Sequence, residues 1–127
     1  MATWQEVKQY IYSNYQVSED TGGYLTLVLK TTFGRSQLVH LACGEGSPYI
    51  SVLSPIGPVS DIDGNRLLAL SSADDKTTGI RQLGNMYMTT ANVLLADLSE
   101  PELEVPMNWA LGEADQYEQA LGLGDRY

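Results

Sequence analysis

Residues 34–57 read GRSQLVHLACGEGSPYISVLSPIG, and they contain two short apolar runs separated by a connection rich in glycine. The runs are residues 38–43 and residues 49–53, and both are built mainly from Val, Ile, Leu and Tyr. Short apolar runs bounded by glycine and proline are typical of β-strands joined by a tight connection. We therefore expect two neighbouring strands in the middle of a sheet. The second should end at residues 54–58, because proline cannot serve a central ladder.

The stretch just before these runs, residues 24–31, shows the clearest alternation in the chain. Leu25, Leu27 and Leu29 fall on one side, and the residues between them fall on the other. A period of two is characteristic of a strand with one buried face. We expect the leucines to pack under helices together with the residues of matching parity in the next two strands, which are Val39, Leu41, Ile50 and Val52.

Both ends of the chain carry helix signals. Thr3-Trp4-Gln5-Glu6 and Ser99-Glu100-Pro101-Glu102 each match a capping box, in which the first and last side chains satisfy each other's backbone amides. The first box predicts a helix over residues 3–15, and the second predicts a long helix closed by Gly122 and Gly124. Apolar residues three or four apart on the long helix should pack on the sheet while its acids face solvent; these are Leu103, Met107, Ala110, Ala114, Tyr117 and Leu121.

The remaining segments complete the order of elements. Residues 18–23 predict a polar turn, residues 63–72 a short helix, and residues 80–83 and 86–95 a hairpin that turns at Gly84-Asn85. The sequence thus predicts one α+β domain spanning residues 1–127. Its antiparallel sheet of about five strands is flanked by an N-terminal helix and a long C-terminal helix, in the order α-βββ-α-ββ-α. A chain of 127 residues is large enough to bury one core.

The charge balance bears on the kinds of partner. The net charge is −9, and residues 97–127 hold eight of the sixteen acids with one arginine. An acidic chain without a Lys/Arg cluster repels phosphate backbones and anionic membrane surfaces, so we expect neither nucleic acid nor membrane as a partner. No cationic and apolar leader is visible, and the single cysteine suits a reducing compartment. These features predict a cytoplasmic protein.

Catalytic and ligand-binding patterns are weak. The one histidine, His40, and the one cysteine, Cys43, lie three positions apart on a strand, so they should point to opposite faces and form no dyad. Residues 61–65 begin like a calcium loop, but Arg66 and Ser72 occupy the positions that need glycine and glutamate. The interpretation there is a turn with a helix cap. We therefore predict no catalytic residues, no metal and no cofactor.

A resemblance covers nearly the whole chain. It rests on Gly34-Arg35-Ser36-Gln37-Leu38-Val39, Ser54-Pro55-Ile56-Gly57, residues 85–98, Ala114-Asp115-Gln116-Tyr117-Glu118 and the final Gly124-Asp125-Arg126-Tyr127. In these motifs and in its order of elements, the chain resembles the bacterial YbjN family, which shares the type III secretion chaperone-like fold. The resemblance implies a non-enzymatic domain, similar to dimeric chaperones that hold extended polypeptide segments, or a regulatory protein.

The second face of the predicted sheet is the candidate site. It is neither plainly polar nor plainly apolar, whereas a face exposed to water should be polar. The residues that would share this face, if the strands pair with the parity given above, are Tyr24, Val28, Leu38, His40, Tyr49 and Leu53. Aromatic and aliphatic residues with few charges are typical of the centre of a protein interface. We predict that these six residues form a partner-binding face.

The sequence is compatible with three different chains or segments that could pack on this face and cover it. A second copy of the chain is the simplest, since twofold homodimers are the commonest assembly. A segment of a client protein is another, and residues 55–72 of the same chain are a third. A different function is also open, in which a small-ligand sensor or enzyme uses a pocket between helices and sheet with polar groups such as Arg35 or Asp115.

Overall fold

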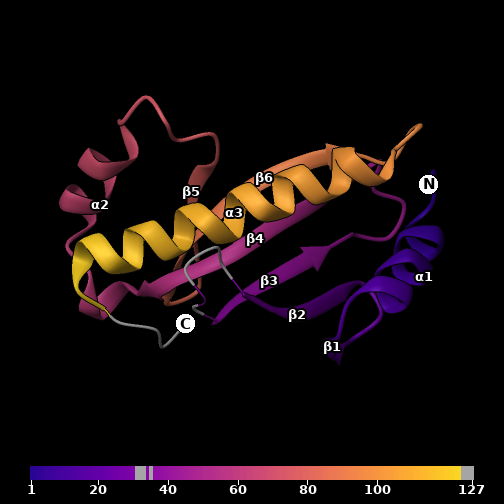
Figure 1. Cartoon of the computed structure of the whole chain (residues 1–127), viewed down its shortest axis with the longest axis horizontal. Coiled ribbons are helices and arrows are strands. Elements are labelled where there is room, and N and C mark those ends of the chain that lie inside the picture. The colour runs from indigo at the N-terminus through magenta and orange to yellow at the C-terminus, as the bar shows by residue number, and fades with distance from the viewer. Residues whose placement is uncertain (31–33, 35, 124–127) are drawn as a thin grey trace.

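The computed structural model describes residues 1–30, 34 and 36–123, and shows one sheet with helices packed on it (Figure 1). The elements in chain order are α1 (Trp4–Asn14), β1 (Val17–Asp20), β2 (Tyr24–Lys30), β3 (Ser36–Ala42), β4 (Tyr49–Pro58), a 3-10 turn η1 (Val59–Asp61), α2 (Gly64–Ser71), β5 (Gly79–Leu83), β6 (Met86–Leu94) and α3 (Glu100–Leu121). The strands form an antiparallel sheet in the order β1-β2-β3-β4-β6-β5. The α+β class and the order of the predicted elements are confirmed.

The sheet has six strands, one more than predicted, because residues 17–20 form β1 where we expected a turn. This strand reads Val-Ser-Glu-Asp and is almost wholly exposed, so it carries no apolar alternation. Backbone pairing with β2 holds it at the sheet edge, with a register shift between Val17 and Glu19. A polar edge strand of this kind is defined by its hydrogen-bond partner, which the sequence pattern does not reveal.

The inner face of the sheet, meaning the face that carries the helices, has the predicted parity. Leu25, Leu27 and the four matching residues of β3 and β4 are fully buried, and Leu29 packs half-buried beside them. The helix side chains that meet them come from α1 and from the first half of α3, and are Val7, Ile11, Leu103, Met107 and Ala110. This contact forms the main core.

The helix ends follow the predicted signals. The Thr3 hydroxyl accepts a hydrogen bond from the Glu6 amide at 3.2 Å, and Ser99 and Glu102 form a complete capping box. Gly122 ends α3 with φ of +72°, a left-handed conformation that glycine adopts without the steric cost of a Cβ. Gly84 turns the β5–β6 hairpin with φ of +58°, and Leu83 pairs with Met86 across it. Gly124 lies outside the described residues.

The strand β4 runs on to Pro58, so the predicted end of this strand at residues 54–58 is wrong. Pro55 pairs with Met88, and a bulge follows between Pro55 and Gly57. On the other side, pairing of β3 with β4 extends only to His40 and Leu53. Pro55 therefore needs no ladder donor on that side, where the Gln37 side chain instead donates to the Pro55 carbonyl at 2.8 Å. Proline is tolerated in a strand at such a bulge.

The acids of α3 do not all face solvent, contrary to the prediction. Asp115 and Glu118 are fully buried and Glu113 nearly so. The Glu113 carboxylate accepts hydrogen bonds from the backbone amides and hydroxyls of Thr77 and Thr78. The second half of α3 is packed against the sheet and against α2 and the loop before β5, so a wider arc of this helix is buried than the predicted stripe.

The parity of β2 can be tested by truncating one inner-face leucine. Leu27→Ala should lower the free energy of unfolding by about 2–5 kcal/mol, because it removes buried atoms and leaves a cavity. Val28→Ala, at the next residue but on the opposite face, is the matched control and should cost less than about 1 kcal/mol. Urea unfolding of both variants measures the difference. Equal losses in the two variants would contradict the assigned faces.

A charge on the α3 stripe tests whether the stripe is core. Ala114→Asp should unfold the domain or release α3, because a buried charge without a partner is costly. Ala120→Asp, on an exposed position of the same helix, should change stability by less than about 1 kcal/mol. Circular dichroism and thermal melting compare the two. A folded Ala114→Asp protein that is only altered in its oligomeric state would instead place the stripe in an interface.

Candidate functional site

The strand register places all six candidate residues on the same face of the sheet, which we call the outer face. Directly paired residues point to the same side of an antiparallel sheet. The pairs Val28–Leu38 and Tyr24–Ala42 join β2 to β3, and His40–Leu53 joins β3 to β4. Tyr49 belongs to this face by alternation from Leu53 along β4. That a partner binds here stays a prediction.

In the described part of the chain, the helices leave the outer face uncovered. The buried side chains of α1 and α3 pack with inner-face residues, and Figure 1 looks onto α3 lying across β4. The helix α2 packs against α3 and β5, where Leu67 joins Ala114 and Tyr117 in a second apolar cluster. The alternative that residues 55–72 fold over the outer face is therefore wrong. Ile56, Ile62 and Leu67 of this segment are instead buried on the α3 side.

The outer face is exposed at its periphery and closed at its centre. Val28 and Tyr49 expose 47% and 44% of their surface, whereas Leu53 exposes 2%. Leu53 pairs with His40 on one side and Thr90 on the other, in the middle of the sheet. The peripheral side chains are thus the ones that a partner would contact first.

A polar and aromatic cluster occupies part of this face. The Tyr24 and His40 rings lie with centroids 5.2 Å apart, and the Thr26 hydroxyl lies 3.0 Å from His40 Nδ1. Burial lowers the pKa of His40 below its ordinary value, and the nearby Glu19 carboxylate opposes that shift. The imidazole is consequently neutral at pH 7, so this face presents a weakly polar surface to a partner.

The histidine and cysteine lie on opposite faces, as predicted. His40 is on the outer face, whereas Cys43 is buried in the main core. Its thiol contacts the Gly44 carbonyl at 3.6 Å, and burial raises the pKa of Cys43. A protonated, buried thiol on the opposite face of the sheet from the imidazole is a poor nucleophile.

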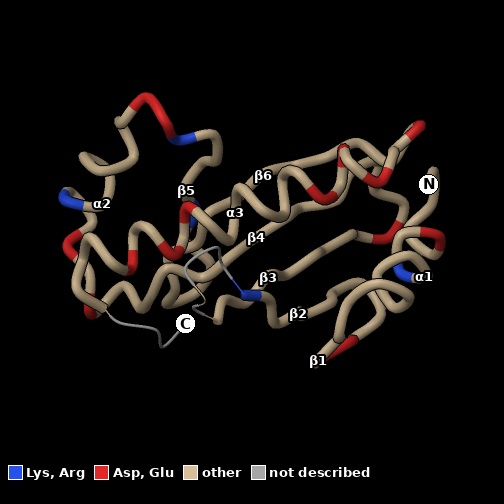
Figure 2. The backbone as a smooth tube through the Cα atoms, viewed as in Figure 1, with Lys and Arg blue, Asp and Glu red and all other residues tan. Residues whose placement is uncertain are grey.

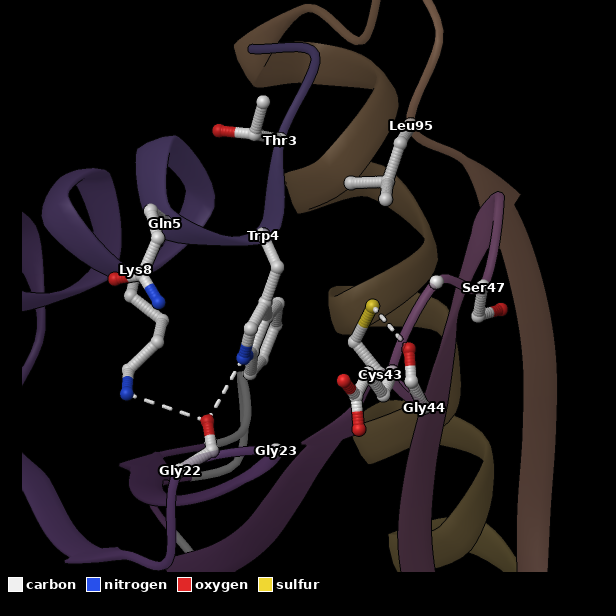
Figure 3. Close-up of a pocket in the computed structure, with 12 residues that line it drawn as sticks. Thr3, Trp4, Gln5, Lys8, Gly22, Gly23, Cys43, Gly44, Ser47 and Leu95 are labelled. Atoms are coloured by element: carbon white, nitrogen blue, oxygen red, sulfur yellow. Dashed lines mark hydrogen bonds between the residues drawn. The ribbon is translucent and has the colours of Figure 1, made fainter.

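A pocket of about 500 Å³ lies between α1, the β1–β2 turn and the β3–β4 connection (Figure 3). Two of its nitrogen donors are already used, since Trp4 Nε1 and Lys8 Nζ donate to the Gly22 carbonyl at 2.8 and 3.2 Å. Lys8 also pairs with Asp20 at 3.2 Å. A ligand site usually aims a few free polar groups at one point, and these nitrogens are aimed at the protein's own backbone.

Of the two polar groups considered for a small-ligand function, Asp115 does not line this pocket. Asp115 is fully buried on α3 and accepts a hydrogen bond from Gln119 at 2.9 Å. Arg35 lies outside the described residues. Over residues 1–30, 34 and 36–123, no three His, Cys, Asp or Glu side chains are grouped so that they could hold a metal ion. None of the described helices combines the length and apolar character needed to cross a membrane.

Sequence reasoning missed one exposed apolar group. Val105 and Trp109 lie one turn apart on α3, away from the buried stripe, and Leu94 lies at the end of β6. The predicted stripe on this helix includes neither Val105 nor Trp109. The spacing of Val105 and Trp109 was the available signal, since residues four apart share one helix face.

Comparison with known proteins bears on the fold. No protein-family model matches the chain, and no curated protein matches it. The chain is similar to a solved structure titled "Structure of the HopA1-SchA Chaperone-Effector Complex", with a TM-score of 0.63 over 87% of this chain and 87% of the matched chain. At 17% identity the likeness concerns the fold. The expected chaperone-like fold is confirmed, and membership of the YbjN family stays a prediction.

The single histidine gives a direct probe of the outer face. We expect an NMR titration of His40 to give a pKa below the ordinary 6.5, because burial disfavours the charged ring. Since the unfolded chain then binds the proton more tightly, the contribution of His40 to stability is complete above about pH 6.5 and is lost as the pH falls. Glu19→Gln should lower the pKa further, because the carboxylate raises it. A His40 pKa at or above 6.5 would contradict this environment.

Proposed function

We propose that the protein is a non-enzymatic protein-binding module with a chaperone-like or regulatory role, and that a protein covers its outer face. The observation that carries this proposal is a sheet face on which no helix of the described residues packs and on which Val28 and Tyr49 are half-exposed. Apolar surface gathered on one face of a small domain is characteristic of an interaction site. The likeness in fold to a chain of a chaperone–effector complex supports the same role.

The first cover that we propose is a second copy of the chain, which would make the protein a homodimer in a cytoplasmic compartment. Two outer faces could meet around a twofold axis, as in most small assemblies. A client segment is the alternative cover. The relation to the bacterial YbjN family belongs to this proposal too, and it rests on the short motifs quoted above.

A small-ligand sensor or enzyme is the second candidate function. The size of the pocket in Figure 3 favours it, because about 500 Å³ falls in the usual range for ligand sites. The internal use of Trp4 Nε1 and Lys8 Nζ weighs against it. Protein binding is therefore the function that we favour.

Sedimentation of three proteins tests the proposed cover. The parent should sediment as a dimer at micromolar concentration, and Val28→Glu should give a folded monomer, because it places a charge in the interface. Leu68→Glu is the matched control, since it adds the same charge at an exposed leucine of α2 away from the outer face. It should remain dimeric.

A monomeric parent would leave the client segment as the cover, and a second measurement then decides. The parent should bind an unfolded probe, carboxymethylated α-lactalbumin, and Val28→Glu should weaken that binding about tenfold. A monomeric parent that does not bind the probe, or binds it equally well with Val28→Glu, would contradict the proposed function.

A further inference from the structure

A second apolar surface lies in a groove between the end of β6 and the first half of α3, and it meets the edge of the outer face at Leu94, which pairs with Tyr49. The groove has a volume of about 550 Å³, and its walls include Leu94, Leu98, Pro101, Glu102, Val105 and Trp109. Leu94 exposes 67%, Trp109 47% and Val105 42% of their surface. Three large apolar side chains thus remain in contact with water around one concavity.

The wall of this groove formed by β6 is also an unpaired strand edge. Pairing of β5 with β6 begins at Leu83–Met86 and ends at Gly79–Thr90, while β6 runs on to Leu94. On that side, no strand among the described residues pairs with β6 beyond Thr90. Residues 91–94 read Ala-Asn-Val-Leu and include no charged residue and no proline. Such residues usually prevent an exposed strand edge from pairing with another chain.

The direction of the backbone groups follows from one hydrogen bond. The Leu95 amide donates to the Pro48 carbonyl at 2.9 Å, on the β4 side. Because the backbone groups of successive residues in a strand point to alternate sides, Ala91 and Val93 also face β4. Asn92 and Leu94 therefore direct their N–H and C=O groups outward, toward the position of an additional strand.

The contacts of Glu113 explain why β5 stops short of this edge. Its carboxylate accepts hydrogen bonds from the amides of Thr77 and Thr78 at 3.0–3.1 Å. These two residues precede Gly79 and are turned toward α3, so they do not continue the ladder on β6. The edge is thus left open by a specific buried contact.

The rim of the groove is acidic. Asp97, Glu100 and Glu102 surround the start of α3, and Figure 2 shows no Lys or Arg on that end of the helix. Hydrogen bonds from Ser99 lower the pKa of Glu102, so it is charged at neutral pH. The helix N-terminus offsets about half a unit of this charge, and the N-terminal ammonium, which donates to the Leu98 carbonyl at 2.7 Å, offsets about one more, so the rim remains acidic. A segment that fits the groove should accordingly be basic.

These observations together identify the occupant. We propose that the groove binds an extended segment of another protein, in which apolar residues are flanked by Lys or Arg, and that this segment adds a strand to β6 at Asn92 and Leu94. Main-chain hydrogen bonds to an edge, with pockets for alternate side chains, are an established mode of peptide recognition. A second copy of this chain fits the groove poorly, because no two of its seven Lys and Arg residues lie within four positions of each other, so it offers no segment in which basic residues closely flank an apolar one on both sides.

Fluorescence of Trp109 gives the primary test. Trp4→Phe leaves Trp109 as the only tryptophan, and the other changes are made in this background. A short synthetic peptide with alternating valine and lysine should shift its emission to the blue on binding, and the matching valine–glutamate peptide should bind at least about tenfold more weakly. Absence of binding by the valine–lysine peptide, or equal binding of both peptides, would overturn the proposal.

One substitution separates docking in the groove from a general attraction between charges. Val105→Glu makes the rim more acidic, so an electrostatic attraction alone would strengthen binding of the basic peptide. Docking into the apolar groove requires the opposite, a loss of about tenfold. Val28→Glu, on the outer face, should leave the affinity within about twofold, so this test succeeds or fails independently of the proposed dimer. Unchanged or tighter binding by Val105→Glu would overturn the proposal.

Hydrogen exchange tests the added strand directly. On peptide binding, exchange of the Asn92 and Leu94 amides should slow about tenfold, because they gain partners. The Ala91 and Val93 amides already face β4 and should not change, so they serve as internal controls. Binding that leaves Asn92 and Leu94 unprotected would overturn the strand addition.

Discussion

The packing of α3 on β4 and β6 is the constraint on which the rest of the structure depends. Its stripe of Leu103, Met107, Ala110 and Ala114 is almost wholly buried, and the Thr89 hydroxyl in β6 donates to the Ala110 carbonyl at 2.8 Å. The start of the chain is fixed to the same unit, since the N-terminal ammonium donates to the Leu98 carbonyl at 2.7 Å. The helices are thereby gathered on the inner face, and among the described residues no helix packs on the outer face.

Much of the fold could be predicted, because the signals for it are local. The alternation of Leu25, Leu27 and Leu29 fixed the inner face, and short-range hydrogen bonds such as that from Glu6 to Thr3 fixed the helix ends. The parity of the candidate face followed from the same alternation. The exposure of each residue on that face could not be predicted in this way, because the burial of Leu53, for example, depends on neighbours from two other strands.

The features that could not be predicted depend on contacts between distant parts of the chain. Glu113 is buried because it meets Thr77 and Thr78, which lie 36 and 35 residues away. The strand β1 exists because β2 offers it an edge, and Pro55 fits into β4 because β3 has already diverged. Single-residue patterns contain no signal for such partners.

The two candidate surfaces differ in chemistry. The outer face is weakly polar around a neutral histidine, which suits a partner of similar character such as a second copy. The groove beside α3 combines an acidic rim with a stretch of β6 that no described strand pairs with on that side, which suits an extended basic segment. A protein that holds a client would benefit from this division, since one surface can assemble copies while the other remains available.

The central claim is that a protein covers the outer face, and site-specific photo-crosslinking in cells tests it most directly. A photoreactive phenylalanine analogue in place of Tyr49 should form a covalent adduct with a second copy or with another protein. The same analogue at Leu68, which is exposed but lies on α2, should form little or none. Absence of an adduct at position 49, or equal yields at both positions, would contradict the account.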